Sequence, residues 1–127
     1  MSAAEPRSID VGGPGRARRI AILQTAPKRA DAPGFLWLQG LKSEMVSTKA
    51  TALDAWCRDR GYGCTRFDYS GHGRSGGVFE EATIGDWLEE AHAVFAACTS
   101  GPQVLVGSST GGYIALLLLR EIGRAHV

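Results

Sequence analysis

Cysteines, long apolar runs and an excess of one charge are all scarce in this sequence. It holds three cysteines in 127 residues, at positions 57, 64 and 98, a spacing that matches neither a zinc-ligand pattern nor a disulfide-rich secreted domain. The longest run without a polar residue, 113–119, is far shorter than the roughly 20 residues of a membrane-spanning helix. We therefore expect no disulfide scaffold, no membrane span and a reducing compartment.

Charge is nearly balanced, with 14 Lys and Arg against 13 Asp and Glu, a formal net charge of +1. A chain without a basic excess is not expected to bind nucleic acid. Its hydrophobic content of 44% is enough for one packed core at this length. We predict one globular domain, with no metal site because no cluster of metal-ligating side chains is present.

The pattern divides the chain into three segments. Residues 1–33 carry most of the prolines and are expected to be loop-rich, with one edge strand at 19–25. Residues 34–120 alternate short apolar runs with helical segments, and residues 121–127 form a polar tail. Alternation of this kind is typical of an α/β domain, a mostly parallel sheet with helices on both faces.

Three strands are predicted in the middle segment, at 35–39, 64–69 and 103–106, each followed by a helix. Ser47 or Thr48 is expected to cap the first helix, whose apolar face would hold Leu53, Trp56 and Cys57. Thr83 with Asp86 three residues later resembles a capping box at the start of the second helix. The order of elements predicts three consecutive parallel strand–helix units.

One motif carries chemistry, G-x-S-x-G at 107–111, placed between a predicted strand and a predicted helix. In this context the serine occupies a tight, strained turn that exposes its hydroxyl, and the flanking glycines make room for it. We therefore predict that Ser109 is a nucleophile and that Gly107, Gly111 and Gly112 provide the space. An ordinary serine and glycine turn is the alternative.

An oxyanion formed next to Ser109 would need backbone donors. The N–H of Thr110 lies at the start of the following helix and is one candidate. The loop after the strand at 35–39 lies at the same sheet edge, which makes the Leu41 N–H the second candidate. A plain turn that ends the strand is the alternative for Gly40 and Leu41.

The segment 71–76 matches G-x-G-x-x-G, a pattern of dinucleotide-binding sites. Its third glycine does not lie inside a helix, and no acidic residue ends the next strand, so we expect no dinucleotide or other cofactor. His72 in this loop is expected to be structural, with a role as a base as the alternative. Asp68 is expected to bind loop amides, and His92 is expected to lie at the surface.

With these residues placed, the chain resembles the first half of an α/β-hydrolase over 34–120. The GHGRSGG loop and the GSSTGG turn are shared widely in that family, and RFDYSGHGRSGG and GPQVLVGSSTGGY are similar to its branch of palmitoyl-protein thioesterases and acyl-glucuronide esterases. The resemblance implies a serine hydrolase acting on acyl thioesters or esters, with Ser109 as nucleophile and the Leu41 and Thr110 amides as oxyanion donors. Gln39 departs from the family, many of whose members have His there.

The family order of catalytic residues is Ser, then Asp or Glu, then His. After Ser109 only Glu121 and His126 remain as candidates, and Glu121 at the far end of the helix is about 18 Å away. We therefore expect an N-terminal, inactive fragment of a hydrolase. Residues 122–127 back-translate into a string that resembles a sequencing adaptor, so 121–127 is predicted to be non-native, with a genuine polar tail as the alternative.

Several functional alternatives stay open at this point. The parent protein is expected to take a small acyl ester or thioester, or an acylated protein, as substrate. A generic carboxylesterase without preference for thioesters is one alternative, and a non-catalytic interaction module is another if the short chain is genuine. The expected location is the cytoplasm, or the mitochondrion if the source is eukaryotic.

Overall fold

Five strands form one sheet in the computed structural model, which describes residues 4–125. The strands run in the spatial order β1-β2-β4-β3-β5. Three α-helices and a short 3₁₀ turn, Phe79–Glu81, connect or follow them. The strands are β1 (Glu5–Val11), β2 (Arg18–Thr25), β3 (Gly34–Leu38), β4 (Gly63–Phe67) and β5 (Gln103–Gly107), and the helices are α1 (Thr48–Arg60), α2 (Ile84–Cys98) and α3 (Thr110–Ala125).

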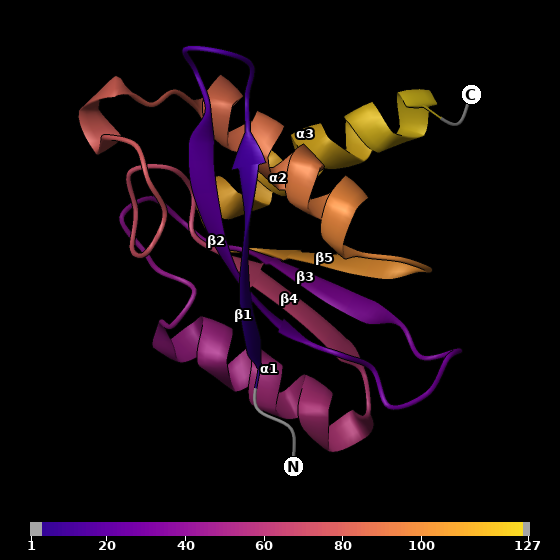
Figure 1. Cartoon of the computed structure of the whole chain (residues 1–127). Helices are drawn as coiled ribbons and strands as arrows, with labels where there is room; N and C mark the ends of the chain where they lie inside the picture. Colours follow the sequence, from indigo (N-terminus) through magenta and orange to yellow (C-terminus); the bar gives the residue numbers. More distant parts are fainter. Residues whose placement is uncertain (1–3, 126–127) are drawn as a thin grey trace.

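The sheet is sandwiched between helices, with α1 on one face and α2 and α3 on the other (Figure 1). Strands β4, β3 and β5 pair in parallel, and each is followed by a helix, which confirms the three predicted strand–helix units. The sheet as a whole is mixed rather than mostly parallel, because β2 pairs antiparallel with both β1 and β4.

The N-terminal segment contains two strands, so the prediction of a single edge strand is wrong. β1 forms a hairpin with β2 in a register that opposes Ile9 to Ile20, and β2 therefore lies inside the sheet. Strand β1 is mostly exposed and carries Pro6 and several charged residues. Such a composition suits an edge strand but gives little apolar alternation from which to predict one.

Helix α1 begins as predicted but turns a different side toward the sheet. Ser47 accepts a hydrogen bond from the Ala50 N–H, and Gly61 ends the helix in the left-handed conformation. The buried side chains are those of Ala50, Asp54 and Cys57, while Trp56 is 41% exposed. The predicted face was wrong at Trp56 because Asp54 is buried with charged partners, which an apolar pattern does not reveal.

The main core lies between the sheet and the α2–α3 layer. Leu36 and Leu38 of β3 pack there with Ala91 and Val94 of α2 and with Ile114 and Leu118 of α3, all six fully buried. The predicted capping box of Thr83 and Asp86 starts α2. This layer fixes the direction in which α3 leaves β5, and therefore the turn that carries Ser109.

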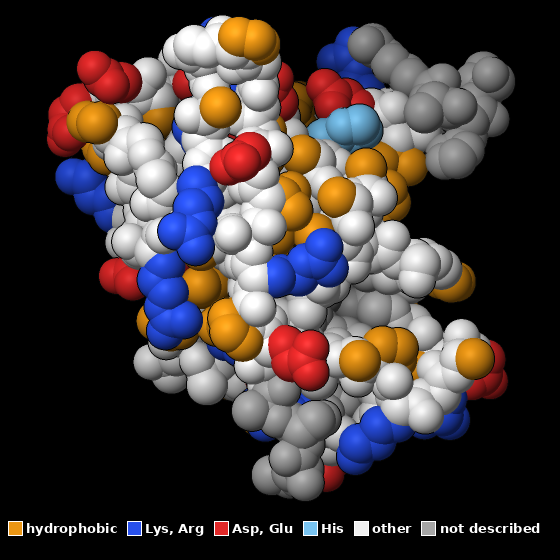
Figure 2. Space-filling view, viewed as in Figure 1, with side chains coloured by type: hydrophobic (Ala, Val, Ile, Leu, Met, Phe, Trp, Pro, Cys, Tyr) orange, Lys and Arg blue, Asp and Glu red, His pale blue; other side chains and the backbone are white. Residues whose placement is uncertain are grey.

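On the face shown in Figure 2, acidic and basic side chains are interspersed rather than gathered by sign, as expected for a net charge of +1. Among the helices of residues 4–125, none combines the length and apolar content needed to span a bilayer.

Candidate active site

Three loops meet at one edge of the sheet, where the parallel strands β3, β4 and β5 end. They are 39–46 after β3, 68–78 after β4, and the turn from Gly107 to Thr110 after β5. Because neighbouring parallel strands end at the same edge, segments far apart in sequence come together there. The candidate site is built from these three loops.

Ser109 occupies the turn between β5 and α3 with a φ of 56°, in the left-handed region. Few non-glycine residues adopt this conformation, and strained serines of this kind occur in nucleophile turns. The preceding Ser108 N–H donates to the Leu38 carbonyl oxygen at 3.1 Å, and the Gly111 N–H donates to the Ser108 carbonyl oxygen at 2.9 Å. Ser109 itself is exposed, so its hydroxyl is accessible.

Two of the three glycines predicted to make room for the turn are sterically required. A β-carbon at Gly107 would lie 2.5 Å from the Gly111 carbonyl oxygen, and one at Gly111 would overlap the Leu38 carbonyl oxygen. Gly112 differs, since a β-carbon there would meet nothing closer than 3.8 Å. The prediction that Gly112 provides room is therefore wrong.

The loop after β3 lies against Ser109. A β-carbon built on Gly40 would lie 3.4 Å from the Ser109 β-carbon and 3.9 Å from its Oγ. Gly40 begins a turn closed by a hydrogen bond from the Ser43 N–H to the Gly40 carbonyl oxygen at 3.2 Å, with Leu41 and Lys42 at its centre. The structure thus brings the segment that carries the Leu41 N–H next to the turn that carries Ser109.

Thr110 is the first residue of α3, directly after Ser109. The N–H groups of a helix's first turn have no partner within the helix, so they are available to an anion. The two candidate donors therefore belong to different segments, Leu41 to the loop after β3 and Thr110 to the start of α3.

Asp68 holds two of the loops together, in agreement with its predicted role. One carboxylate oxygen accepts the Met45 N–H at 2.8 Å and the other accepts the Arg74 N–H at 2.9 Å. The carboxylate is 1% exposed, and Gly73 packs so closely that a β-carbon there would overlap it. Asp68 is thus a structural tie behind the site.

His72 also links two loops by hydrogen bonds, the loop 68–78 and the turn at Gly40. Its Nε2 accepts the Lys42 N–H at 2.9 Å, and its Nδ1 lies 3.0 Å from the Ser70 carbonyl oxygen. Lys42 has a φ of 60° and was not singled out from the sequence. No local signal could have found it, because a lysine in this conformation depends on a partner 30 residues away.

Gln39, which stands where many family members have His, points inward. Its Nε2 donates to the Phe67 carbonyl oxygen at 2.7 Å, linking the ends of β3 and β4. The departure from the family pattern thus leaves a structural hydrogen bond in that place and does not touch the backbone donors.

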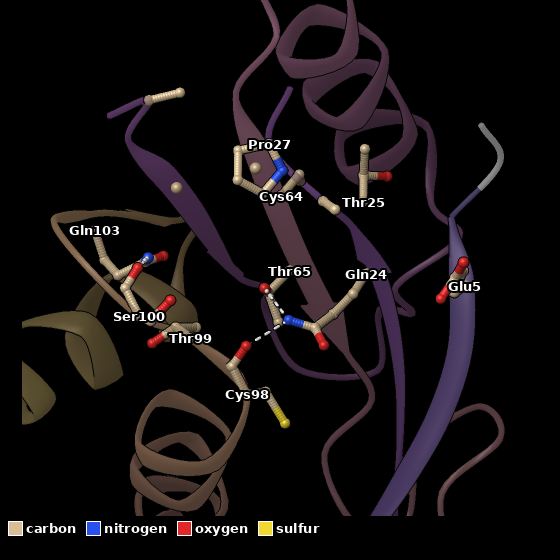
Figure 3. Close-up of a pocket in the computed structure, with 14 residues that line it drawn as sticks. Glu5, Gln24, Thr25, Pro27, Cys64, Thr65, Cys98, Thr99, Ser100 and Gln103 are labelled. Carbon is tan, nitrogen blue, oxygen red and sulfur yellow. Dashed lines mark hydrogen bonds between the residues drawn. The ribbon is translucent and has the colours of Figure 1, made fainter. Parts of the chain in front are cut away.

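One hollow in the surface lies near Ser109 and another lies far from it. One, of about 360 Å³, adjoins the turn and is lined by Gly40, Ser108 and residues at the start of α1, including Lys49, whose Nζ lies 3.5 Å from the Ser108 Oγ. The other, of about 320 Å³, lies at the amino ends of the parallel strands, where the Gln24 amide donates to Thr65 Oγ1 and the Cys98 carbonyl oxygen (Figure 3). Of these two hollows, only the first adjoins the turn that carries Ser109.

The cysteines are poor alternatives to Ser109 as nucleophiles. Cys57 lies on the buried side of α1 and Cys64 is buried in β4. A hydrogen bond to Cys57 together with burial raises the pKa of Cys64. Burial also raises the pKa of Cys98. Since the thiolate is the reactive form, a raised pKa disfavours attack by either thiol.

Within residues 4–125, no histidine or carboxylate is hydrogen-bonded to Ser109. Both ring nitrogens of His72 are engaged, His92 is exposed on α2, and Glu121 lies in the last part of α3. His126 lies outside the described residues. The helical conformation of 121–125 does not test the predicted non-native origin of 121–127, which stays a prediction.

Comparison with known proteins agrees with this geometry. The model of the family described as serine aminopeptidase, S33, matches residues 28–126. The chain belongs to this family of α/β-hydrolases, which confirms the resemblance seen in the sequence.

Among individual proteins, the chain is 42% identical over 88 residues to the human mitochondrial palmitoyl-protein thioesterase ABHD10, an alignment covering 69% of this chain and 29% of that one. A protein from Agrobacterium vitis S4, known from a crystal structure, is 46% identical, with a TM-score of 0.95 over 97% of this chain and 47% of that one. Mouse alpha/beta hydrolase domain-containing protein 10 is 32% identical, with a TM-score of 0.79 over 90% and 43%. The chain therefore spans less than a third of the curated relatives it matches.

Proposed function

We propose that the protein is a serine hydrolase that cleaves acyl thioesters or esters through an acyl-enzyme on Ser109. The observation that carries the proposal is the left-handed φ of Ser109 in a turn between a parallel strand and a helix, packed against Gly40. Such a turn presents the hydroxyl outward, as a nucleophile requires.

In the proposed reaction, Ser109 Oγ attacks the acyl carbonyl carbon and passes its proton to a general base. The negative charge that develops on the carbonyl oxygen is stabilised by the N–H groups of Leu41 and Thr110. The C–S or C–O bond then breaks, and the thiol or alcohol leaves with the proton. Water hydrolyses the acyl-enzyme, releasing a carboxylic acid and restoring the serine.

The general base and its acidic partner are not assigned to described residues. We propose that they come from the part of the complete gene product that corresponds to the remainder of the relatives, of which the matched residues are 29%. By this proposal residues 4–125 contribute the nucleophile and both oxyanion donors but are inactive by themselves, and no cofactor takes part.

The preference for thioesters is supported by the name of the curated relatives, palmitoyl-protein thioesterase. A small acyl thioester or an acylated protein is therefore the proposed substrate class. We place the protein in the cytoplasm, or in the mitochondrion if its source is eukaryotic, since that compartment also appears in the relatives' names.

Covalent labelling tests the nucleophile. The complete gene product is treated with a fluorophosphonate and the labelled peptide is identified. Labelling is expected in the wild-type protein and in Ser108→Ala, the matched control one residue away, but not in Ser109→Ala. Labelling that persists in Ser109→Ala would contradict the assignment of Ser109 as the nucleophile.

Comparing kcat/KM for an acyl thioester and the matched oxygen ester separates a thioesterase from a generic carboxylesterase. A third hypothesis is that the protein is a non-catalytic interaction module. Its only support is that no base is hydrogen-bonded to Ser109 within the described residues. It predicts no fluorophosphonate labelling of the complete gene product at all.

A further inference from the structure

His72 is neither a nucleophile nor an oxyanion donor, yet it links the glycine loop to the turn that carries Leu41. Its Nε2 accepts the Lys42 N–H at 2.9 Å. The residue is only 5% exposed. The His72 end of this hydrogen bond is therefore shielded from water, although Lys42 itself is exposed. Leaving a buried acceptor without its donor costs more than losing a hydrogen bond at the surface.

The two hydrogen bonds of the ring define its tautomer. Nδ1 lies 3.0 Å from the Ser70 carbonyl oxygen, which can only accept, so Nδ1 carries the proton. In the neutral ring Nε2 is then without a proton and can accept the Lys42 N–H. Both bonds require the same neutral tautomer, so the ring serves as a donor on one side and an acceptor on the other.

The ring is held in this orientation by aromatic neighbours. Tyr69, Phe79 and Trp87 surround it edge-on, with centroid distances of 5.9, 5.3 and 5.5 Å. The indole N–H of Trp87 donates to the same Ser70 carbonyl oxygen at 3.2 Å. Because packing leaves the ring little freedom to tilt, Nε2 presents a fixed acceptor to the neighbouring loop.

Lys42 needs such an acceptor. It occupies the third position of the Gly40–Ser43 turn with a φ of 60°, where glycine or asparagine is the usual choice. The hydrogen bond to His72 fixes the orientation of the peptide group between Leu41 and Lys42. The turn that carries the Leu41 N–H is thereby held in a conformation that a lysine would otherwise disfavour.

We propose that His72 is a positioning residue for the reaction: it holds the Gly40–Ser43 turn so that the Leu41 N–H faces the oxyanion formed when Ser109 attacks. This inference rests on the proposed serine-hydrolase function. It gives His72 no part in proton transfer, since both ring nitrogens are occupied by backbone groups.

Two substitutions separate the hydrogen bond to Lys42 from the hydrogen bond to Ser70. In His72→Gln the side chain extends to the place of Nε2 and can still accept the Lys42 N–H. In His72→Asn the amide nitrogen replaces Nδ1 and can still donate to Ser70, but nothing reaches Lys42. The complete gene product and both variants are compared for kcat, KM and fluorophosphonate labelling rate with an acyl thioester substrate that turns over in the wild type.

The expected result is a split between the two variants. His72→Asn should lower kcat by about 10²-fold, comparable to removing one oxyanion donor, with KM changed by no more than about twofold. His72→Gln should keep kcat within about threefold of the wild type. Hydrogen exchange at the Lys42 amide should accelerate in His72→Asn only, which reports on the turn independently of activity.

Equal kcat in the wild type and His72→Asn, or an equal loss in both variants, would overturn the inference, because a merely structural role does not distinguish the two amides. So would unchanged exchange at Lys42 in His72→Asn. A wild-type protein that is not labelled at Ser109 contradicts the serine-hydrolase proposal itself, whereas normal labelling with no difference between variants contradicts only the role of His72.

Discussion

Ser109 and Lys42 share an unusual backbone conformation, and both lie at the carboxyl edge of the sheet. They are the non-glycine residues with positive φ in the described part of the chain, at 56° and 60°. Such conformations cost about 1 to 3 kcal/mol each and persist only where the surroundings enforce them. Both residues lie in loops at the edge of the sheet where the candidate site is. The fold is therefore less stable at this edge than it would be without these two backbone conformations.

Two glycines of the turn that carries Ser109 should change folding stability in opposite directions when each is replaced by alanine. Gly111→Ala should destabilise the fold by about 2 to 3 kcal/mol, because its β-carbon would overlap the Leu38 carbonyl oxygen. Gly112→Ala, one residue along, should stabilise it by about 0.5 to 1 kcal/mol, since the position is helical and has space. Urea unfolding measures both, and destabilisation by Gly112→Ala comparable to that of Gly111→Ala would contradict the steric argument.

Residue-scale features were predictable where their cause is local. Ser109, Gly107 and Gly111 follow from one short motif between a strand and a helix, and the capping box of Thr83 follows from its three-residue spacing. The tie between His72 and Lys42 depends on two loops that meet only in the folded sheet. No spacing in the sequence indicates it.

At the scale of a single element, α1 is anchored by a buried charge. Asp54 is 1% exposed and accepts the Thr25 hydroxyl at 2.6 Å, and it pairs with Arg58 and, at 3.6 Å, with the buried Arg66. Arg66 in turn donates to the Met45 carbonyl oxygen at 2.9 Å. The network connects α1 to β2, β4 and the loop that leads from Gly40.

Removing this carboxylate should leave buried guanidinium charge without its partner. Asp54→Ala is expected to lower the free energy of unfolding by about 3 kcal/mol or more. Asp59→Ala on the same helix is the control, since that side chain is 81% exposed and should change stability by less than about 0.5 kcal/mol. Similar losses in the two variants would show that Asp54 contributes only as a surface charge does.

The start of α2 should respond to acid. Burial opposes ionisation of Asp86, but hydrogen bonds from Thr83 and the charges of Arg18 and Arg16 outweigh it and lower the pKa of that carboxyl. A lowered pKa in the folded state means that Asp86 stabilises the fold above its usual pKa of about 4 and loses this effect as the pH falls through the lowered value.

The comparison of wild type with Asp86→Ala makes this measurable. The difference in unfolding free energy should be largest from about pH 6 upward, at about 1 kcal/mol, and shrink toward pH 2. Chemical unfolding at a series of pH values follows it. A difference that grows as the pH falls would contradict the sign of the shift.

Elements with strong apolar runs or clear caps were predictable, and those defined by their neighbours were not. The bounds of β3, β4 and β5 and the starts of α1 and α2 agree with the sequence patterns within one or two residues. β1 was missed because an exposed edge strand needs little apolar content, and it holds β2 inside the sheet. The buried side of α1 was misread because Asp54 is covered by its ion pairs.

At the scale of the whole molecule, α3 and the edge strand β5 expose apolar side chains. Leu116 is 68% exposed, Leu119 59%, Tyr113 54% and Val104 44%. Apolar surface of this kind promotes association when it faces water. The 127-residue chain by itself is expected to self-associate with rising concentration in sedimentation velocity.

Substitution on that surface provides the control. Leu116→Lys with Leu119→Lys should shift the chain toward monomer at the same concentration, because two charges replace exposed leucines, whereas Glu121→Lys on the same helix should have little effect. A wild-type chain that stays monomeric over the whole concentration range would show that this surface is tolerated in water.

The meeting of three loops at one edge was predictable from parallel strand–helix units, since such strands end together. The spatial order β1-β2-β4-β3-β5 was not, because the sequence order of strands does not state which neighbours pair.

Trapping the acyl-enzyme tests most directly whether Ser109 is the nucleophile. The complete gene product is mixed with an acyl thioester, quenched in acid within one turnover, and its peptides are analysed by tandem mass spectrometry. We expect the mass of the acyl group on Ser109 in the wild type and in Ser108→Ala, and no such adduct in Ser109→Ala. An acyl group found on another residue during turnover would contradict the role of Ser109. So would full activity of Ser109→Ala together with no acylated peptide.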